Sequence, residues 1–352
     1  MIHDDGKETI FEEVIALISN SWPTAVSASV GVLFHMICLI AVGRISEQEL
    51  AGTGLGIMFC NVTGYSVITG IASGFETVAS QLNGAGHQRL IGVALQRALF
   101  VASAAAALVI LVWFFAELIL SFFVDEELSI IAGEFIRTMC LALCLFLAND
   151  CVQRYLSAQG IFLPAMYSSL VALLLYAPLC WFLVVTLGMG ASGGALAITV
   201  GEAGSLALLV SYIRWRGIHS YTWGGWSSDA LCGTLEFMRV ALPSCGMICL
   251  EWWCLEIVTL ASAQLGTAAV AAQVVLFNTN CIAYRVGQGF AVAVGSRIGN
   301  LLGAGRSEVA ARAAFLAWGT CVAVMLLLMA GLYMWRREWA GALPFLCLLV
   351  CA

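Results

Sequence analysis

Residues 163–187 read LPAMYSSLVALLLYAPLCWFLVVTL and contain no Asp, Glu, Lys or Arg. A bilayer core of roughly 30 Å is crossed by about 20 apolar helical residues, so this stretch is long enough to span a membrane. Because it is continuously apolar rather than alternating, it predicts a helix and not a barrel strand. Other stretches share this character, which predicts about nine full spans: 12–43, 49–77, 91–120, 128–157, 163–187, 192–213, 232–262, 267–295 and 307–334.

The composition of the whole chain agrees with this reading. Of its 352 residues, 62% are hydrophobic and 10% are charged, whereas soluble domains average roughly 45–50% apolar and about 25% charged residues. A soluble globule and a disordered chain are therefore excluded. The net charge is −6, and no basic cluster suits a nucleic acid. The fold class is predicted to be an all-α integral membrane protein whose partner is the lipid bilayer.

The first residues, MIHDDGKETIFEEV, are acidic, unlike a signal peptide. Lys and Arg gather in the predicted loops that share a side with the N-terminus, so the N-terminus is expected to be cytoplasmic. A plasma membrane and a vacuolar-type membrane fit this pattern equally well.

An internal repeat is visible at an offset of 219 or 220 residues. The matched pairs are Pro23 with Pro243, Leu50-Ala51 with Val270-Ala271, Gly70 with Gly289, and Gly84-Ala85-Gly86 with Gly303-Ala304-Gly305. The offset covers an even number of spans, so both copies insert in the same direction, as parallel repeats do. We therefore expect an N-lobe over 1–220 and a partial C-lobe over 221–352, which ends in the start of a tenth helix.

Several short motifs follow the order and spacing of a known family. The most specific is Cys249-Leu250-Glu251-Trp252-Trp253 with Glu256. The others include Asn61-Val62-Thr63-Gly64, Gly74-Phe75-Glu76-Thr77, Gln96-Arg97, Arg154-Tyr155-Leu156, Pro243-Ser244, Asn278-Thr279 and Arg297-Ile298-Gly299-Asn300. Over nearly the whole chain, this pattern resembles the eukaryotic multidrug and toxin extrusion (MATE) transporters.

The resemblance implies two six-helix lobes around a central cleft with alternating access. It also implies a secondary antiporter that exports organic cations, drugs or metabolites in exchange for protons or sodium ions, with no cofactor, no metal site and no enzymatic activity. The sequence ends before the last three helices of that pattern. We therefore expect a C-terminally truncated family member, either because the sequence is incomplete or because self-association completes the second lobe.

Glu251 is the leading candidate for ion coupling, because it lies near the middle of the seventh predicted span. Ionisable residues at that depth are energetically costly and are therefore candidates for a function by default. A carboxyl surrounded by apolar protein takes up a proton more readily than one in water. The ionised form would attract a cation and the protonated form would release it, whereas the structural alternative is a packing hydrogen bond. Glu256 lies about 140° around the helix and roughly 7.5 Å along it. We therefore expect one of the two acids to line the cleft and the other to face a neighbouring helix.

Four further residues are candidates for the substrate cleft. Asn278 occupies a position where the family has a polar or acidic residue, and Asn61 is the polar candidate in the first lobe. Either amide could orient a substrate or make an interhelical hydrogen bond. Trp252 and Trp253 could form an aromatic wall for a cation or could serve only packing.

Three charged residues could modulate the site or be structural. Arg285, where the family has an apolar residue, is predicted at a depth similar to that of Glu251, which suggests an ion pair between them. Glu202 is either an additional acid of the cleft or a satisfied packing residue. Glu76 is expected to form a structural clamp with Arg97 or Arg154.

Two other functions remain open at this stage. A flippase for a lipid-linked precursor would require a strongly basic cleft, and the spans offer few arginines for one. A transporter-derived scaffold or receptor that does not transport is a different class, which a transport assay would distinguish. An enzyme is the least favoured class, because the chain has no HExxH motif.

Overall fold

The computed structural model describes residues 10–263, 267–336 and 338, and that part of the chain is helical without a β-strand. The first bundle comprises α1 (Ile10–Gly43), α2 (Glu47–Cys60), α3 (Ser66–Gly84), α4 (Gln88–Phe114), α5 (Ala116–Leu120), α6 (Glu126–Ala158), α7 (Leu163–Trp181) and α8 (Gly190–Trp215). After the short helix α9 (His219–Thr222) come α10 (Thr234–Ala263), α11 (Thr267–Gly303) and α12 (Ser307–Met334). Within the described residues, eight segments are long and apolar enough to cross a membrane. The eighth predicted span, 267–295, is not among these segments and falls on α11, which is 37 residues long.

Two of the predicted spans contain a π-helical turn. Residues Asn61–Tyr65 join α2 to α3, and Phe182–Thr186 extend α7. In both cases the chain continues as one membrane segment, Glu47–Gly84 and Leu163–Thr186 respectively. Such turns rotate the side chains that follow and are frequent at functional sites, and Asn61 occupies the first position of one of them.

The apolar side chains divide between an interior and an outer surface. Trp113 and Tyr176 are fully buried in the first bundle, and each satisfies its polar atom: Trp113 donates to Thr63 and Tyr176 donates to the Phe34 carbonyl. By contrast, Leu174 is 74% exposed. Many other large apolar side chains are also exposed, among them Leu108, Leu175 and Leu327. Soluble proteins rarely expose so much apolar surface, so this outer surface is suited to lipid.

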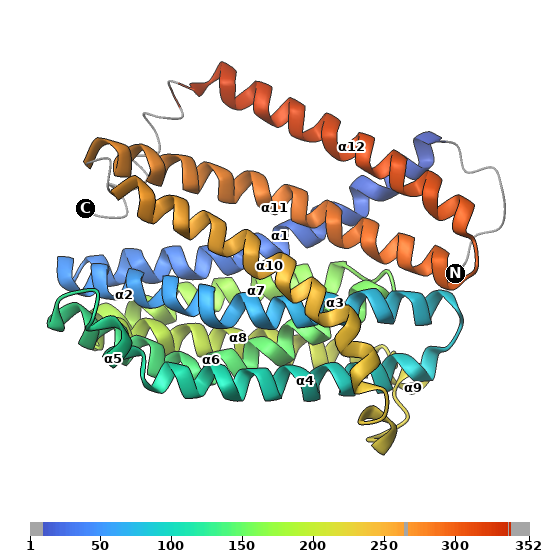
Figure 1. Cartoon of the computed structure of the whole chain (residues 1–352), viewed down its shortest axis with the longest axis horizontal. Helices are drawn as coiled ribbons and strands as arrows, with labels where there is room; N and C mark the ends of the chain where they lie inside the picture. Colours follow the sequence, from blue (N-terminus) through green and yellow to red (C-terminus); the bar gives the residue numbers. More distant parts are fainter. Residues whose placement is uncertain (1–9, 264–266, 337, 339–352) are drawn as a thin grey trace.

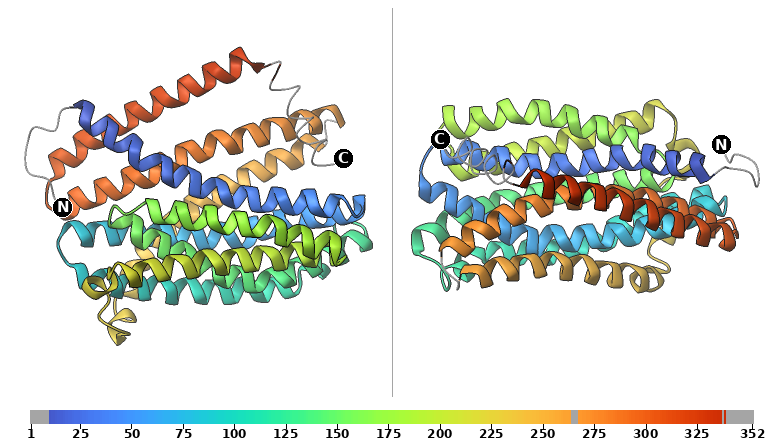
Figure 2. Two further views of the ribbon diagram at one scale, coloured as in Figure 1. Left: turned by 180° about the vertical axis from the view of Figure 1, so that it is seen from behind. Right: turned by 90° about the horizontal axis from the view of Figure 1, so that it is seen from above.

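Helices α10, α11 and α12 lie on one side of the first bundle (Figures 1 and 2). Helix α11 packs against α1, α3 and α12, and α10 packs against α3. The halves therefore meet along α1 and α3 on one side and α10 and α11 on the other. Pro23 and Pro243 lie inside α1 and α10, where proline removes a helical hydrogen bond.

Residues that are 219 or 220 positions apart in the sequence make equivalent close contacts between the two halves. A methyl group added at Gly70 of α3 would lie 3.0 Å from the Cys245 Cβ of α10. A methyl group added at Gly289 of α11 would lie 2.6 Å from the Ala25 Cβ of α1. Gly289 and Cys245 are the repeat partners of Gly70 and Ala25, so the same contact is made twice with the roles exchanged. Reciprocal contacts of this kind define an approximate two-fold axis, which confirms the parallel repeat.

A second set of reciprocal glycine contacts closes one end of the interface between the halves. Gly84 of α3 abuts the backbone of Asn300, and Gly303 of α11 abuts the backbone of Gln81. Gly299 packs on Ser80. We call these six residues the seam. Side chains reinforce it, because Asn83 donates to Asn300 over 2.7 Å. Gly84 and Gly303 leave no room for a Cβ because it would overlap the opposing backbone, and a Cβ at Gly299 would overlap the Ser80 side chain.

The linker between the halves is held by the first bundle. Gln96 of α4 donates to the Gly225 carbonyl over 2.8 Å and accepts from the Ser227 amide over 2.9 Å. Arg97 donates to the backbone carbonyls of Asp229, Ala230 and Cys232. Arg97 is therefore a linker clamp, and it is not the partner of Glu76.

Candidate functional site

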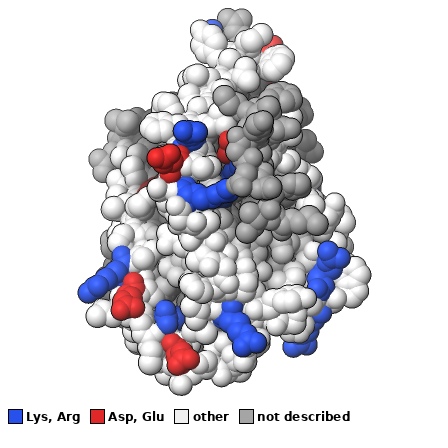
Figure 3. Space-filling view, turned by 90° about the vertical axis from the view of Figure 1, so that its right-hand side faces the viewer, with Lys and Arg blue, Asp and Glu red and all other residues white. Residues whose placement is uncertain are grey.

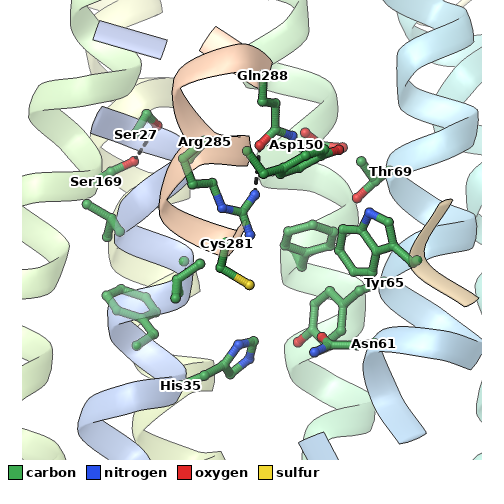
Figure 4. A pocket seen from close by; sticks show the side chains of 18 of the residues that line it. Ser27, His35, Asn61, Tyr65, Thr69, Asp150, Ser169, Cys281, Arg285 and Gln288 are labelled. Carbon is green, nitrogen blue, oxygen red and sulfur yellow. Dashed lines mark hydrogen bonds between the residues drawn. The ribbon is translucent and has the colours of Figure 1, made fainter. Parts of the chain in front are cut away.

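A cavity of about 420 Å³ lies between the two halves (Figure 4). Its wall is formed by α1, α6, α7, α8 and the α2–α3 segment of the first bundle and by α10 and α11 of the second group. Ligand sites for small organic molecules typically enclose about 300–1,000 Å³. Four carboxylates line this cavity: Asp150 and Glu202 on one wall and Glu251 and Glu256 on the other.

The wall from the first bundle carries a connected polar network. Arg154 of α6 donates to the Glu76 carboxylate over 2.7 Å and to the Asp150 carboxylate over 3.2 Å. The Arg154 and Glu76 side chains are only 10% and 9% exposed. Two carboxylates around one buried guanidinium leave a net negative charge on this wall when both are ionised. The expected clamp of Glu76 with Arg154 is thus present.

Glu202 joins the same wall from α8. Asn149 donates to its carboxylate over 2.8 Å and also lies 3.3 Å from the Ser205 hydroxyl. The sequence left open whether Glu202 is an acid of the cleft or a satisfied packing residue. It is both, because its carboxylate accepts a hydrogen bond and still lines the cavity.

Helix α10 supplies both predicted coupling acids to the opposite wall. Glu251 is exposed and accepts a hydrogen bond from the Tyr284 hydroxyl of α11 over 3.4 Å. Glu256 is half-buried and lines the same cavity. One acid was expected to line the cleft and the other to face a neighbouring helix. Instead both line the cavity, and Glu251 also faces the neighbouring helix α11 through Tyr284. The cavity is long enough along the helix axis to reach two positions more than one turn apart.

The expected pairing of Arg285 with Glu251 is also not found. The Arg285 guanidinium donates to the Gln288 side chain over 2.7 Å and lies 5.7 Å from the centroid of the Tyr284 ring. Among the described residues it makes no ion pair with a carboxylate. A similar depth in antiparallel helices does not place two side chains on facing sides, and here the partner of Glu251 is Tyr284.

The remaining predicted cleft residues separate into three groups. Asn61 and Trp252 line the cavity. Trp253 points elsewhere, because its indole donates to the Val62 carbonyl over 3.0 Å and it is not part of the cavity wall. Asn278 lies on α11, but its side chain is outside the described residues.

The sequence reasoning missed several residues of the wall. Asp150 follows Asn149 in the middle of an apolar span, and an Asn-Asp pair at that depth was a signal for a cavity. Tyr284 and Gln288, which neighbour Arg285, were also missed although both line the cavity. Within residues 10–263, 267–336 and 338, no cluster of three His, Cys, Asp or Glu side chains could hold a metal ion.

The fold and the cavity together define a polytopic membrane protein whose related halves enclose a site of solute size. The sequence matches the MatE family over residues 23–182 and 243–344. It is 33% identical to Protein DETOXIFICATION 48 of Arabidopsis thaliana over 93% of this chain and 62% of that protein. It is 32% identical to multidrug and toxin extrusion protein 1 of Danio rerio over 84% of this chain and 50% of that protein.

A solved structure gives the same result. The crystal structure of the eukaryotic MATE transporter AtDTX14 superposes with a TM-score of 0.87 at 28% identity, over 93% of this chain and 74% of that one. The chain belongs to the MatE family, whose members are transporters and not enzymes. It spans only about half to two thirds of the length of the two curated relatives named above.

Proposed function

We propose that this protein is a secondary active antiporter that exports organic cations, drugs or metabolites in exchange for protons or sodium ions. The observation that carries the proposal is the cavity between the halves, which has carboxylates on both walls. Ionised carboxylates attract a cation, and protonation releases it, so one acidic site can serve the coupling ion and the substrate in turn. Membership of the MatE family supports the same activity.

Alternating access then follows from the position of the seam. The seam closes one end of the interface between the lobes, and residues 1–220 and 221–352 move as two lobes about the cavity. Glu251 and Glu256 on α10 are assigned to ion coupling, with Asp150 and Glu202 as their counterparts on the opposite wall. Asn61 and Trp252 contact the substrate in this scheme, and Trp253 holds the two halves together.

The seam end is assigned to the cytoplasm. Lys and Arg side chains are spread over this face of the molecule (Figure 3). Arg89, Arg214 and Arg216 lie at the ends of α4 and α8 on this side. Positive residues are retained on the cytoplasmic side of membrane proteins, which supports a cytoplasmic N-terminus in a plasma or vacuolar-type membrane.

The test is uptake of a fluorescent organic cation by proteoliposomes that contain the full chain, under an imposed pH gradient. Wild-type protein should concentrate the cation, and Glu251→Gln should reduce uptake at least tenfold because the coupling carboxylate is lost. Glu117→Gln is the matched control, because Glu117 forms a surface ion pair away from the cavity. A sodium gradient in place of the pH gradient identifies the coupling ion. Uptake that survives Glu251→Gln, or no uptake from folded protein under either gradient, would refute the proposal.

A further inference from the structure

Arg285 is the one arginine on the cavity wall that lacks a carboxylate partner among the described residues. Arg154, the other, is bound by two carboxylates. The Arg285 side chain is half-buried and its Nε atom is buried without a hydrogen-bond partner. Among the side chains that the structure describes, the only acceptor that it reaches is the neutral amide of Gln288. Figure 4 shows the guanidinium directed into the cavity, between Gln288 and Cys281.

This arrangement leaves a permanent positive charge without a counter-charge at membrane depth. A guanidinium stays protonated in proteins, and a buried charge without a partner is costly. The amide dipole of Gln288 and the electron-rich face of the Tyr284 ring both stabilise the cation. Neither group carries a negative charge that would neutralise it. Its free N–H groups form a planar fork, whose best partner is a carboxylate bound through two hydrogen bonds.

Tyr284 places this cationic group next to an anionic one. The Tyr284 hydroxyl donates to Glu251 over 3.4 Å, and the Tyr284 ring lies 5.7 Å from the Arg285 guanidinium carbon. One side chain therefore separates a carboxylate from a guanidinium on the same wall. The two charges are kept too far apart for an ion pair and remain available to a ligand.

We propose that the cavity binds a zwitterionic organic solute, with its carboxylate on Arg285 and its ammonium group toward Glu251. This inference rests on the proposed transport function and narrows its substrate class. A simple organic cation would meet Glu251 but would leave Arg285 uncompensated. A solute whose two charges are separated by a ring or a short chain would satisfy both groups, and the tyrosine ring sets the spacing.

A matched pair of ligands tests the inference by direct binding to the purified full chain. The probes are 4′-(aminomethyl)biphenyl-4-carboxylate, which is a zwitterion, and its methyl ester, which is only a cation. Wild-type protein should bind the zwitterion at least tenfold more tightly than the ester, because hydrogen bonds between charged partners are the strong ones. Arg285→Leu should remove this preference, and Arg285→Lys should retain part of it because the charge remains without the fork.

The controls separate a local effect from a general one. Arg137→Leu removes an arginine from a surface pair with Glu117 and should leave the preference unchanged. Elution profile and melting temperature report whether each variant is folded, and Arg285→Lys keeps the test usable if the leucine variant is not. An equal affinity of wild type for both probes, or an unchanged ratio in a folded Arg285 variant, would overturn the inference. Failure of zwitterion uptake under either gradient, with Arg285-dependent zwitterion binding intact, would instead count against the transport proposal alone.

Discussion

A single methyl group at the seam is expected to shift the protein toward the state in which this end is open. In Gly84→Ala, the new Cβ would lie 2.6 Å from the carbonyl carbon of Asn300, whereas ordinary contact begins at 3.4 Å. The carbonyl oxygen of Asn300 lies nearer still, and both atoms belong to a helix backbone, so the two halves must separate by more than about 0.8 Å or distort. Overpacking of this kind costs about 1–3 kcal/mol. The cost applies only to the closed seam, so the odds of the open state should rise by roughly 5- to 150-fold.

Double electron–electron resonance spectroscopy, which measures the distance between two spin labels, would detect this shift across the seam. Spin labels at His87 and Glu308, both exposed at the seam end, report the separation of the halves. The chain has 14 cysteines, so the labels should be attached to ketone-bearing amino acids and not to thiols. Gly84→Ala should add weight to longer distances in reconstituted protein. Gly303→Ala should do the same, because it meets Gln81 in the symmetric contact, with 2.8 Å to the carbonyl carbon.

The control is Gly295→Ala on α11, where an added methyl group meets nothing within 4 Å. This variant should leave the distance distribution unchanged, and it corrects for the general effect of replacing a helical glycine by alanine. If both seam variants keep the wild-type distribution while remaining folded, the seam is not what holds this end closed. The reasoning from reciprocal glycine contacts would then be wrong.

Two further predictions concern stability. Arg154→Leu should lower the free energy of unfolding by about 3–5 kcal/mol, because it leaves Glu76 as an uncompensated buried charge. Chemical denaturation in detergent measures this loss. A loss below about 1 kcal/mol, which is the value expected for the exposed Arg137 pair, would contradict the prediction. Gln96→Leu removes both hydrogen bonds that hold the linker backbone and should cost about 1–3 kcal/mol locally. Limited proteolysis should cut residues 216–233 faster in this variant, and an unchanged cleavage rate would show that the linker is held by other contacts.

Hydropathy alone was sufficient to predict the helices. The uncharged stretch 163–187 became one membrane segment, Leu163–Thr186, because an apolar run of that length leaves no other way to satisfy its backbone in lipid. The repeat was also legible in the sequence, since glycine and proline at a fixed offset mark backbone positions that cannot be changed freely. The π-helical turn at Asn61–Tyr65 was not legible, because one additional residue in a helical turn leaves the hydropathy pattern intact.

The sequence by itself determined how deep each ionisable residue lies, and it therefore identified Glu251, Glu202 and Arg285 as unusual. Only the tertiary structure decided which of them face one another. The rotation of each helix about its own axis is fixed by packing against neighbouring helices. Hydropathy gives little information about this rotation when the outer face contacts lipid and the inner face is also apolar. For that reason the sequence paired Glu251 with Arg285, whereas the packed helices place Tyr284 between them and bring Asp150 to the same cavity.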